Sequence, residues 1–172
     1  MTTTDERRAA LLEQAVASEA VRRRYESKVL RGQGNECWVW LGAITRHGHG
    51  RFWLGRAPGR NGARDRDVVV IAHRFGFALA WGLDALLEAP VLAHSCDEPW
   101  CQQPTHLEPS TQADNRDDWL RRRWHPRSPL RDVRGPRGRA VAVREAARAG
   151  RNITAARAAG ISALDDGQLL LW

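Results

Sequence analysis

The segment between His94 and His106 constrains the fold of this 172-residue chain more than any other. It carries Cys96 and Cys101 in a C-x4-C-x4-H arrangement, and thiolate and imidazole groups are the ligands that Zn²⁺ prefers in tetrahedral sites. The rest of the segment is rich in Pro, Gln and acidic residues and has no helical or strand periodicity. Because such a loop has little else to offset the entropy lost on ordering, the spacing predicts that it folds around one zinc ion.

Cys37 is the only other cysteine of the chain and is the candidate for the fourth ligand. An odd number of cysteines argues against a disulfide framework. A closed Cys3His site made of Cys37, Cys96, Cys101 and His106 predicts a structural zinc, because a catalytic zinc keeps one position open. Cys37 would then join the first strand to the loop. The alternative for Cys37 is a buried thiol that binds no metal.

His94 stays outside this ligand set and is a candidate general base, because the pKa of a neutral imidazole lies near the operating pH of enzymes. It ends a predicted strand, and the chain must bend after it if Cys96 is to reach the zinc. Asn115 lies near the start of a helix predicted over residues 111–123. Its side-chain oxygen is a suitable ligand for Mg²⁺. A base on a strand and a metal ligand on the next helix indicate phosphodiester hydrolysis.

Hydrophobic patterns predict an α+β protein in three parts. Residues 1–35 are expected to form an N-terminal helical extension with one helix over residues 5–26. Residues 36–123 are expected to form the main domain. Residues 124–172 hold a Pro-, Gly- and Arg-rich linker up to residue 138, then an Arg-rich helical tail and a short apolar terminus.

Within the main domain, four apolar stretches predict strands, which read CWVWL, GHGRFWLG, DVVVIA and APVLAH. A helix is predicted over residues 73–83, and residues 95–109 are predicted to be an irregular loop. No run of 18 apolar residues occurs, so no membrane span is expected. The charged N-terminus lacks the apolar centre of a signal peptide, and we expect a cytoplasmic protein.

Five stretches of the main domain together resemble the HNH endonucleases, also called His-Me finger or ββα-metal nucleases: CWVW, GHGRF, AHRF, HSCDEPWCQQPTHL and ADN. The chain is most similar to phage-type HNH proteins and to the His-Cys box homing endonucleases, over residues 36–120. The resemblance implies a ββα-metal core with extra antiparallel strands and a divalent-metal-dependent DNA endonuclease. It assigns the general base to His94 and a catalytic divalent metal, Mg²⁺ or another cation, to Asn115. It assigns structural zinc to Cys37, Cys96, Cys101 and His106.

Several basic residues are candidates for contacts with DNA. The formal net charge is +7, and all but one of the 27 basic residues are arginines, which suits a polyanionic partner. Arg51 on the GHGRF strand is predicted either to contact the scissile phosphate or to be an exposed strand arginine. His73 is expected to be a structural hydrogen-bonding residue, and His47 and His49 to be solvated or to contact phosphate. The Arg-rich stretch after residue 119 is expected to follow the DNA backbone through Arg121, Arg122, Arg123 and Arg127.

The terminus QLLLW resembles the short peptide that binds the bacterial sliding clamp, through Gln168, Leu169, Leu171 and Trp172. The alternative is that this terminus packs on its own domain. The partners expected are therefore double-stranded DNA, a sliding clamp and a second copy of the chain as a homodimer. Two other functions compete with the nuclease, namely a non-catalytic zinc-bearing DNA-binding protein and a clamp-tethered accessory factor.

Overall fold

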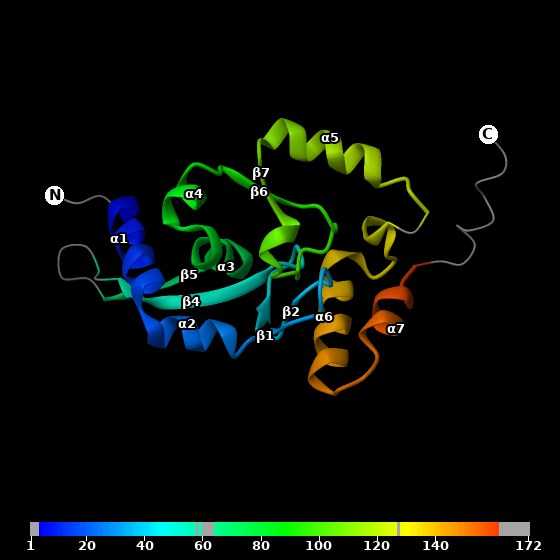
Figure 1. The fold of residues 1–172 in the computed structure, drawn as a ribbon, viewed down its shortest axis with the longest axis horizontal. Coiled ribbons are helices and arrows are strands. Elements are labelled where there is room, and N and C mark those ends of the chain that lie inside the picture. Colours follow the sequence, from blue (N-terminus) through cyan, green and yellow to red (C-terminus); the bar gives the residue numbers. More distant parts are fainter. Residues whose placement is uncertain (1–3, 58, 60–63, 127, 162–172) are drawn as a thin grey trace.

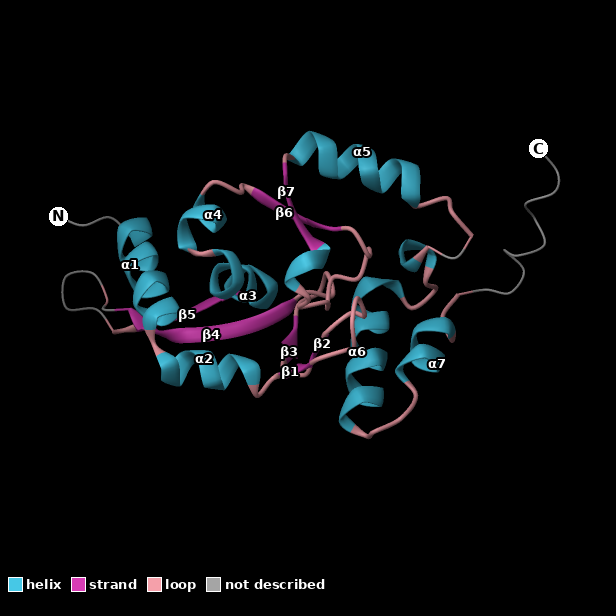
Figure 2. Ribbon diagram, in the orientation of Figure 1, coloured by secondary structure: helices cyan, strands magenta, loops and turns pink. Residues whose placement is uncertain are grey.

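The computed structural model describes residues 4–57, 59, 64–126 and 128–161, and these residues form an α+β protein (Figure 1). Figure 2 shows one long strand across the middle of the ribbon, with helices on either side of it. The predicted fold class is therefore confirmed. No helix in the described ranges is long and apolar enough to cross a membrane.

Two helices, α1 (Thr4–Ala17) and α2 (Glu19–Glu26), stand where the sequence predicts one. Ser18 separates them, because its backbone is extended and its hydroxyl accepts a hydrogen bond from the Val21 amide at 3.4 Å. A serine in this position satisfies an amide that the first turn of a helix leaves unpaired, so it begins a new helix. Ala15 and Tyr25 are buried in the main core and hold both helices there.

The central sheet has three antiparallel strands, β3 (Ala43–Ile44), β4 (Gly50–Ala57) and β5 (Arg66–Ile71), in the order β3-β4-β5. Along β4, Phe52 and Leu54 are buried, whereas Arg51 and Trp53 are exposed. This alternation is the two-residue period of a strand with one face in the core. A separate pair joins β1 (Val29–Leu30) to β2 (Val39–Trp40). The predicted CWVWL strand is thus only two residues long, and Cys37 precedes it.

An aromatic cluster fills the space between the sheet and the helices. Tyr25, Trp40, Phe52 and Phe75 contact one another with ring centroids 4.8–6.1 Å apart. Phe75 lies on α3 (Ala72–Trp81), which follows β5 without a loop, and α4 (Leu83–Leu87) follows after Gly82. Edge-to-face contacts of this kind add to the free energy of burying the rings.

A strand–strand–helix unit contains most of the candidate site. It consists of β6 (Val91–His94), β7 (Leu107–Ser110) and α5 (Gln112–Arg122), and β6 pairs antiparallel with β7. The prediction of a loop is wrong for residues 107–109, because pairing with β6 makes them extended although LEPS has no strand pattern of its own. The predicted cap of α5 is present, since the Thr111 hydroxyl accepts a hydrogen bond from the Asp114 amide at 3.1 Å.

The C-terminal segment is helical, but it packs on the core instead of forming a linker and a tail (Figure 1). The predicted linker contains the 3-10 turn η3 (Pro129–Arg131) and the start of α6 (Gly135–Arg148), and α7 (Ile153–Ala158) follows. Ala140 and Val143 of α6 are completely buried. Three arginines of α6 donate to backbone carbonyls near β3, so they are used inside the protein: Arg137 to Ile44, Arg144 to Gly42 and Arg148 to Leu41.

A buried ion network ties α6 and α7 to the loop after β6. Arg139 pairs with both Glu98 and Asp132, and its side chain is 3% exposed. Arg157 donates to Glu98 at 3.0 Å, and Arg134 pairs with Asp132 at 2.6 Å. Because each ion loses its hydration, the charges persist in the interior only with matched partners. The partners of Glu98 lie 41 and 59 residues further along the chain, which is why no local pattern predicts the network.

Candidate metal centre and histidine cleft

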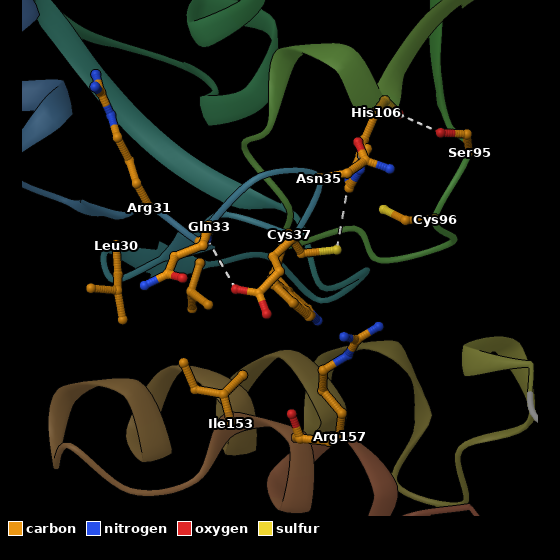
Figure 3. Close-up of a pocket in the computed structure, with 15 residues that line it drawn as sticks. Leu30, Arg31, Gln33, Asn35, Cys37, Ser95, Cys96, His106, Ile153 and Arg157 are labelled. Atoms are coloured by element: carbon orange, nitrogen blue, oxygen red, sulfur yellow. Dashed lines mark hydrogen bonds between the residues drawn. The ribbon is translucent and has the colours of Figure 1, made fainter.

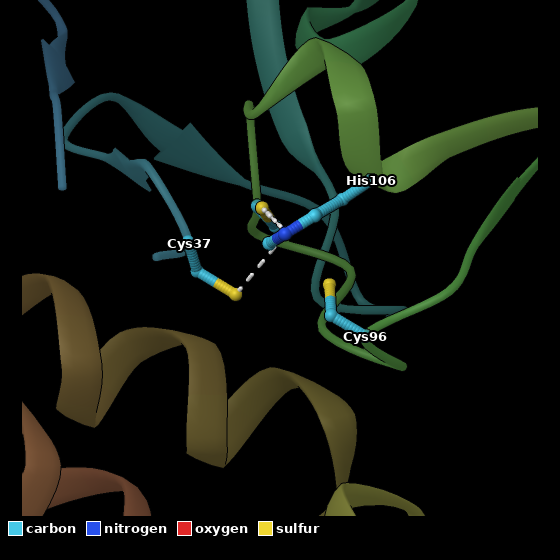
Figure 4. A group of neighbouring side chains, drawn as sticks. Cys37, Cys96 and His106 are labelled. Carbon is cyan, nitrogen blue, oxygen red and sulfur yellow. Dashed lines mark hydrogen bonds between the residues drawn. The ribbon is translucent and has the colours of Figure 1, made fainter. Parts of the chain in front are cut away.

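Four residues from three parts of the chain form a Cys3His cluster (Figure 4). Their ligand atoms all lie within 4.8 Å of one another. The His106 Nδ1 atom is 3.5 Å from Cys101 Sγ and 3.7 Å from Cys37 Sγ. The structure thus brings together the predicted ligand set of Cys37, Cys96, Cys101 and His106, and this set can bind a metal such as zinc.

Backbone contacts explain why the loop presents its ligands to one point. Val39 of β2 forms a bridge with Cys101, and the Gln102 amide donates to the Trp38 carbonyl at 2.9 Å. The predicted bend after His94 is present, since the Asp97 amide donates to the His94 carbonyl at 3.1 Å. Asp97 has a φ of 55°, a left-handed conformation that Asp and Asn tolerate better than most residues. This turn sends Cys96 away from the line of β6.

The donor set fits a thiolate-binding cation. The His106 Nε2–H donates to the Asn35 side-chain oxygen at 3.1 Å, which leaves the Nδ1 lone pair directed at the sulfurs. Hydrogen bonds from the Cys101 and Cys96 thiols lower the pKa of Cys37 to about 4, and the same contacts raise the pKa of Cys101. The pKa values of Cys37 and Cys101 are thus shifted in opposite directions, and a bound dication would favour the thiolate form of its ligands. No local sequence pattern marks Asn35 as the hydrogen-bond partner of His106.

A cavity of about 930 Å³ opens beside the cluster. Figure 3 shows Cys37, Cys96 and His106 on one side of it and Ile153 and Arg157 of α7 on the other. The loop that follows β1 supplies further lining residues. The cluster therefore has an entry path for a metal ion that needs no opening of the core.

His94 lies outside the Cys3His cluster, in a second group of neighbouring side chains. Its Nε2–H donates to the Cys101 carbonyl at 3.3 Å, so the lone pair of the neutral ring is on Nδ1. Burial lowers the pKa of His94 to about 4. The ring is accordingly neutral near pH 7 and able to accept a proton.

Two further histidines surround His94. The ring centroid of His73 lies 4.5 Å from that of His94, and the ring of His49 stacks on His94 at 5.9 Å. His49 donates from Nδ1 to the Pro99 carbonyl at 3.2 Å and is half-buried. The sequence had predicted that His49 would be solvated or would contact phosphate. His73 was expected to make a structural hydrogen bond, but its buried Nδ1 has no partner among the described residues. Burial lowers the pKa of both rings.

His94 and Asn115 both line a second cavity, of about 720 Å³, which we call the histidine cleft. His94 enters it from the end of β6, and Asn115 is an exposed residue of α5. His49, Arg116 and Arg122 line the same cleft. Arg51 is exposed on β4 and is not among the described lining residues, although it lies two residues beyond His49.

The arginines predicted to bind DNA differ in their surroundings. Arg122 pairs with Asp97 at 3.2 Å and with Asp118 at 3.3 Å, and it donates to the Ser95 carbonyl, so it ties α5 to the turn after β6. Arg121 is exposed and also pairs with Asp118. Arg123 lies over the rings of two tryptophans. Arg127 and the terminal Gln168, Leu169, Leu171 and Trp172 lie outside the described residues.

Comparisons with known proteins add one distant relative. No family model matches the chain, and no solved structure matches it. The chain is 29% identical over 84 residues to Protein 2.8 of Escherichia phage T7, a name that describes no activity. The match covers 49% of each protein, so the chain spans about half the length of the curated relative it matches. The chain is thus similar to a phage protein, and this likeness indicates no chemistry for the site.

Proposed function

We propose that this protein is an endonuclease that uses a divalent metal ion to hydrolyse phosphodiester bonds in double-stranded DNA. The observation that carries the proposal is the meeting of His94 and Asn115 in one cleft. They come from a strand–strand–helix unit, which is the order implied by the resemblance to the ββα-metal nucleases. The net charge of +7 supports a polyanionic substrate.

His94 acts as the general base in this proposal. The Cys101 carbonyl holds the proton on Nε2, so Nδ1 accepts the proton of the attacking water. The depressed pKa keeps the ring unprotonated at neutral pH. The carbonyl belongs to a residue of the Cys3His cluster, so we assign a structural zinc to that cluster, with the task of orienting the base.

Asn115 is the proposed ligand for the catalytic divalent cation. Its neighbour Asp114 accepts a hydrogen bond from the Thr111 hydroxyl at 2.8 Å and is not among the lining residues, whereas Asn115 and Gln112 both line the cleft and carry an amide oxygen. One protein oxygen fits Mg²⁺, which commonly takes its other ligands from phosphate and water. When bound, the cation supplies charge neutralisation at the scissile phosphate and the leaving oxygen. Arg116 lines the cleft, and Arg51 is exposed on β4 two residues after His49. We assign contacts with phosphate oxygens to both arginines.

The central test is cleavage of supercoiled plasmid by the wild type and by His94→Ala, with Mg²⁺ and with EDTA. We expect wild-type nicking or linearisation that EDTA abolishes, and a loss of about 10²- to 10⁴-fold in the variant, the usual contribution of a general base. DNA affinity and the zinc of the Cys3His cluster should stay at wild-type values. His125→Ala is the matched control, since His125 is an exposed histidine remote from α3 and β6 in the sequence.

Undiminished cleavage by His94→Ala would contradict the assignment of the base. A shift of the plasmid without any cleavage would favour the competing function, a zinc-bearing DNA-binding protein that lacks catalysis.

The clamp interaction stays a prediction that rests on the terminus QLLLW. Deleting the last five residues should abolish binding to an immobilised sliding clamp and leave plasmid cleavage unchanged. Equal clamp binding by the truncated and full-length chains would show that the terminus is not the contact.

A further inference from the structure

We propose that His49, His73 and His94 form a second metal site, which binds a transition-metal dication and thereby inhibits the nuclease. Each residue offers one ring nitrogen, and these three atoms lie within 4.8 Å of one another. In a tetrahedral site with Zn–N bonds of about 2.0–2.1 Å, two ligand nitrogens lie about 3.4 Å apart. On metal binding, the spacing of up to 4.8 Å between the three nitrogens would contract to that value. The binding of the metal is argued from the histidines alone, and its inhibitory effect rests on the proposed function.

The buried ring of His73 is an independent sign of a missing ligand. The residue is 5% exposed, and its Nδ1 has no hydrogen-bond partner among the described residues. An unsatisfied buried polar atom has lost its hydration without gaining a partner, so native proteins rarely retain one without a reason. A cation held among the three rings would supply that partner.

Backbone carbonyls already orient the other two rings as metal ligands are oriented. The Pro99 carbonyl accepts from His49 Nδ1, and the Cys101 carbonyl accepts from His94 Nε2. Histidines that bind metals commonly donate their second nitrogen in this way, which fixes the tautomer and the ring plane. The lone pairs of His49 Nε2 and His94 Nδ1 are left for a cation.

The donor set determines which cations fit. Three neutral imidazoles with neither a carboxylate nor a thiolate favour Zn²⁺, Cu²⁺, Ni²⁺ or Co²⁺ over Mg²⁺, which prefers oxygen ligands. His49 and His94 line the histidine cleft, so water can take the fourth position. A cation bound here occupies His94 Nδ1, the atom that would accept the proton of the attacking water. The site therefore switches the nuclease off when a transition metal is available.

Metal binding is tested on the full chain without any activity measurement. Cobalt titration followed by visible absorption should show two classes of site, one with sulfur-to-cobalt charge transfer from the Cys3His cluster and one with ligand-field bands alone. Equilibrium dialysis should find two Co²⁺ or Zn²⁺ per wild-type chain and one per His49→Gln chain. The matched control His125→Gln should bind two. His49 is half-buried, so this variant is better suited to folding than a change at His73.

The inhibitory effect is tested by adding Zn²⁺ to the plasmid assay at constant excess Mg²⁺. Each protein is compared with its own uninhibited rate, and the half-inhibitory Zn²⁺ concentration should rise at least tenfold in His49→Gln and remain unchanged in His125→Gln. One metal per wild-type chain, or two in His49→Gln, would overturn the site. Cleavage that Zn²⁺ supports or leaves unchanged would overturn the inhibition. A wild type that binds two metals but never cuts DNA would refute the proposed function and leave the site standing.

Discussion

The two histidine-bearing clusters of this protein line different cavities, yet only one of the clusters can be recognised in the sequence. Three of the four Cys3His ligands lie between residues 96 and 106, and cysteine is rare enough in this chain to mark the fourth. The His49, His73 and His94 cluster draws one residue each from the turn before β4, from α3 and from β6. Ligands close in sequence reveal themselves by spacing, whereas ligands brought together by packing do not.

The clusters also differ in what they are suited to do. The Cys3His cluster joins β2 to the loop after β6 and orients the Cys101 carbonyl. His49 and His94 line a cleft together with Asn115 and two arginines of α5. The first holds the shape of the loop, and the second depends on that shape for its tautomers. Disruption of the first cluster should therefore damage both, and disruption of the second should leave the first intact.

Cys101→Ser should have the largest effect, because it removes a ligand and disturbs the carbonyl that holds His94. We expect a loss of one bound zinc and of at least ~3 kcal/mol in unfolding free energy, equivalent to roughly 6–12 °C in Tm for a chain of this size. Plasmid cleavage should fall with it. Zinc content and calorimetric melting measure these effects, and Thr105→Ser, at an exposed position of the same loop, is the control. If Cys101→Ser keeps the full zinc content and the wild-type Tm, the Cys3His cluster does not hold the shape of the loop.

Arg139→Met should have the next largest effect, because it leaves the Glu98 and Asp132 carboxylates in the interior without this partner. Breaking a buried pair on one side costs about 3–5 kcal/mol. Glu98 lies in the loop that carries Cys96 and Cys101, so the zinc bound there should also dissociate faster into a chelator. Denaturant unfolding and chelator competition test this, with the surface change Arg121→Met as control. Equal unfolding free energies in the two variants would show that the network is not needed for stability.

Asn115→Ala should affect chemistry and spare stability, because Asn115 is exposed on α5. We expect kcat/KM to fall about 100-fold, which corresponds to about 2.7 kcal/mol of transition-state stabilisation, while zinc content and Tm stay unchanged. Asn115→Asp keeps an oxygen ligand and should recover part of the activity at lower Mg²⁺. Asp117→Ala on the exposed surface of the same helix is the control. If Asn115→Asp loses as much activity as Asn115→Ala, the side chain of residue 115 does not bind the metal.

The sequence predicted the fold class and the Cys3His ligand set because both depend on local patterns. Strand alternation along β4 and the capping of α5 by Thr111 arise within a few residues and were readable. The short strand β7 and the break at Ser18 were missed, since one depends on pairing with β6 and the other on a single side-chain hydrogen bond. The arginines of α6 were expected to follow DNA, because composition does not distinguish a basic surface from arginines that bind internal carbonyls.

By itself the sequence predicted that residues 96–106 can gather a metal and that His94 stays outside the Cys3His ligand set, because spacing and ligand chemistry are local properties. Tertiary structure alone decided that Glu98 is neutralised by Arg139, and that His49 and His73 surround His94. These groups are far apart along the chain, and they meet because burying the apolar faces of β4, α3 and α6 in one core brings together the segments that carry them. The spacing along the chain specifies the Cys3His cluster, and the packing of the core specifies the histidine cleft.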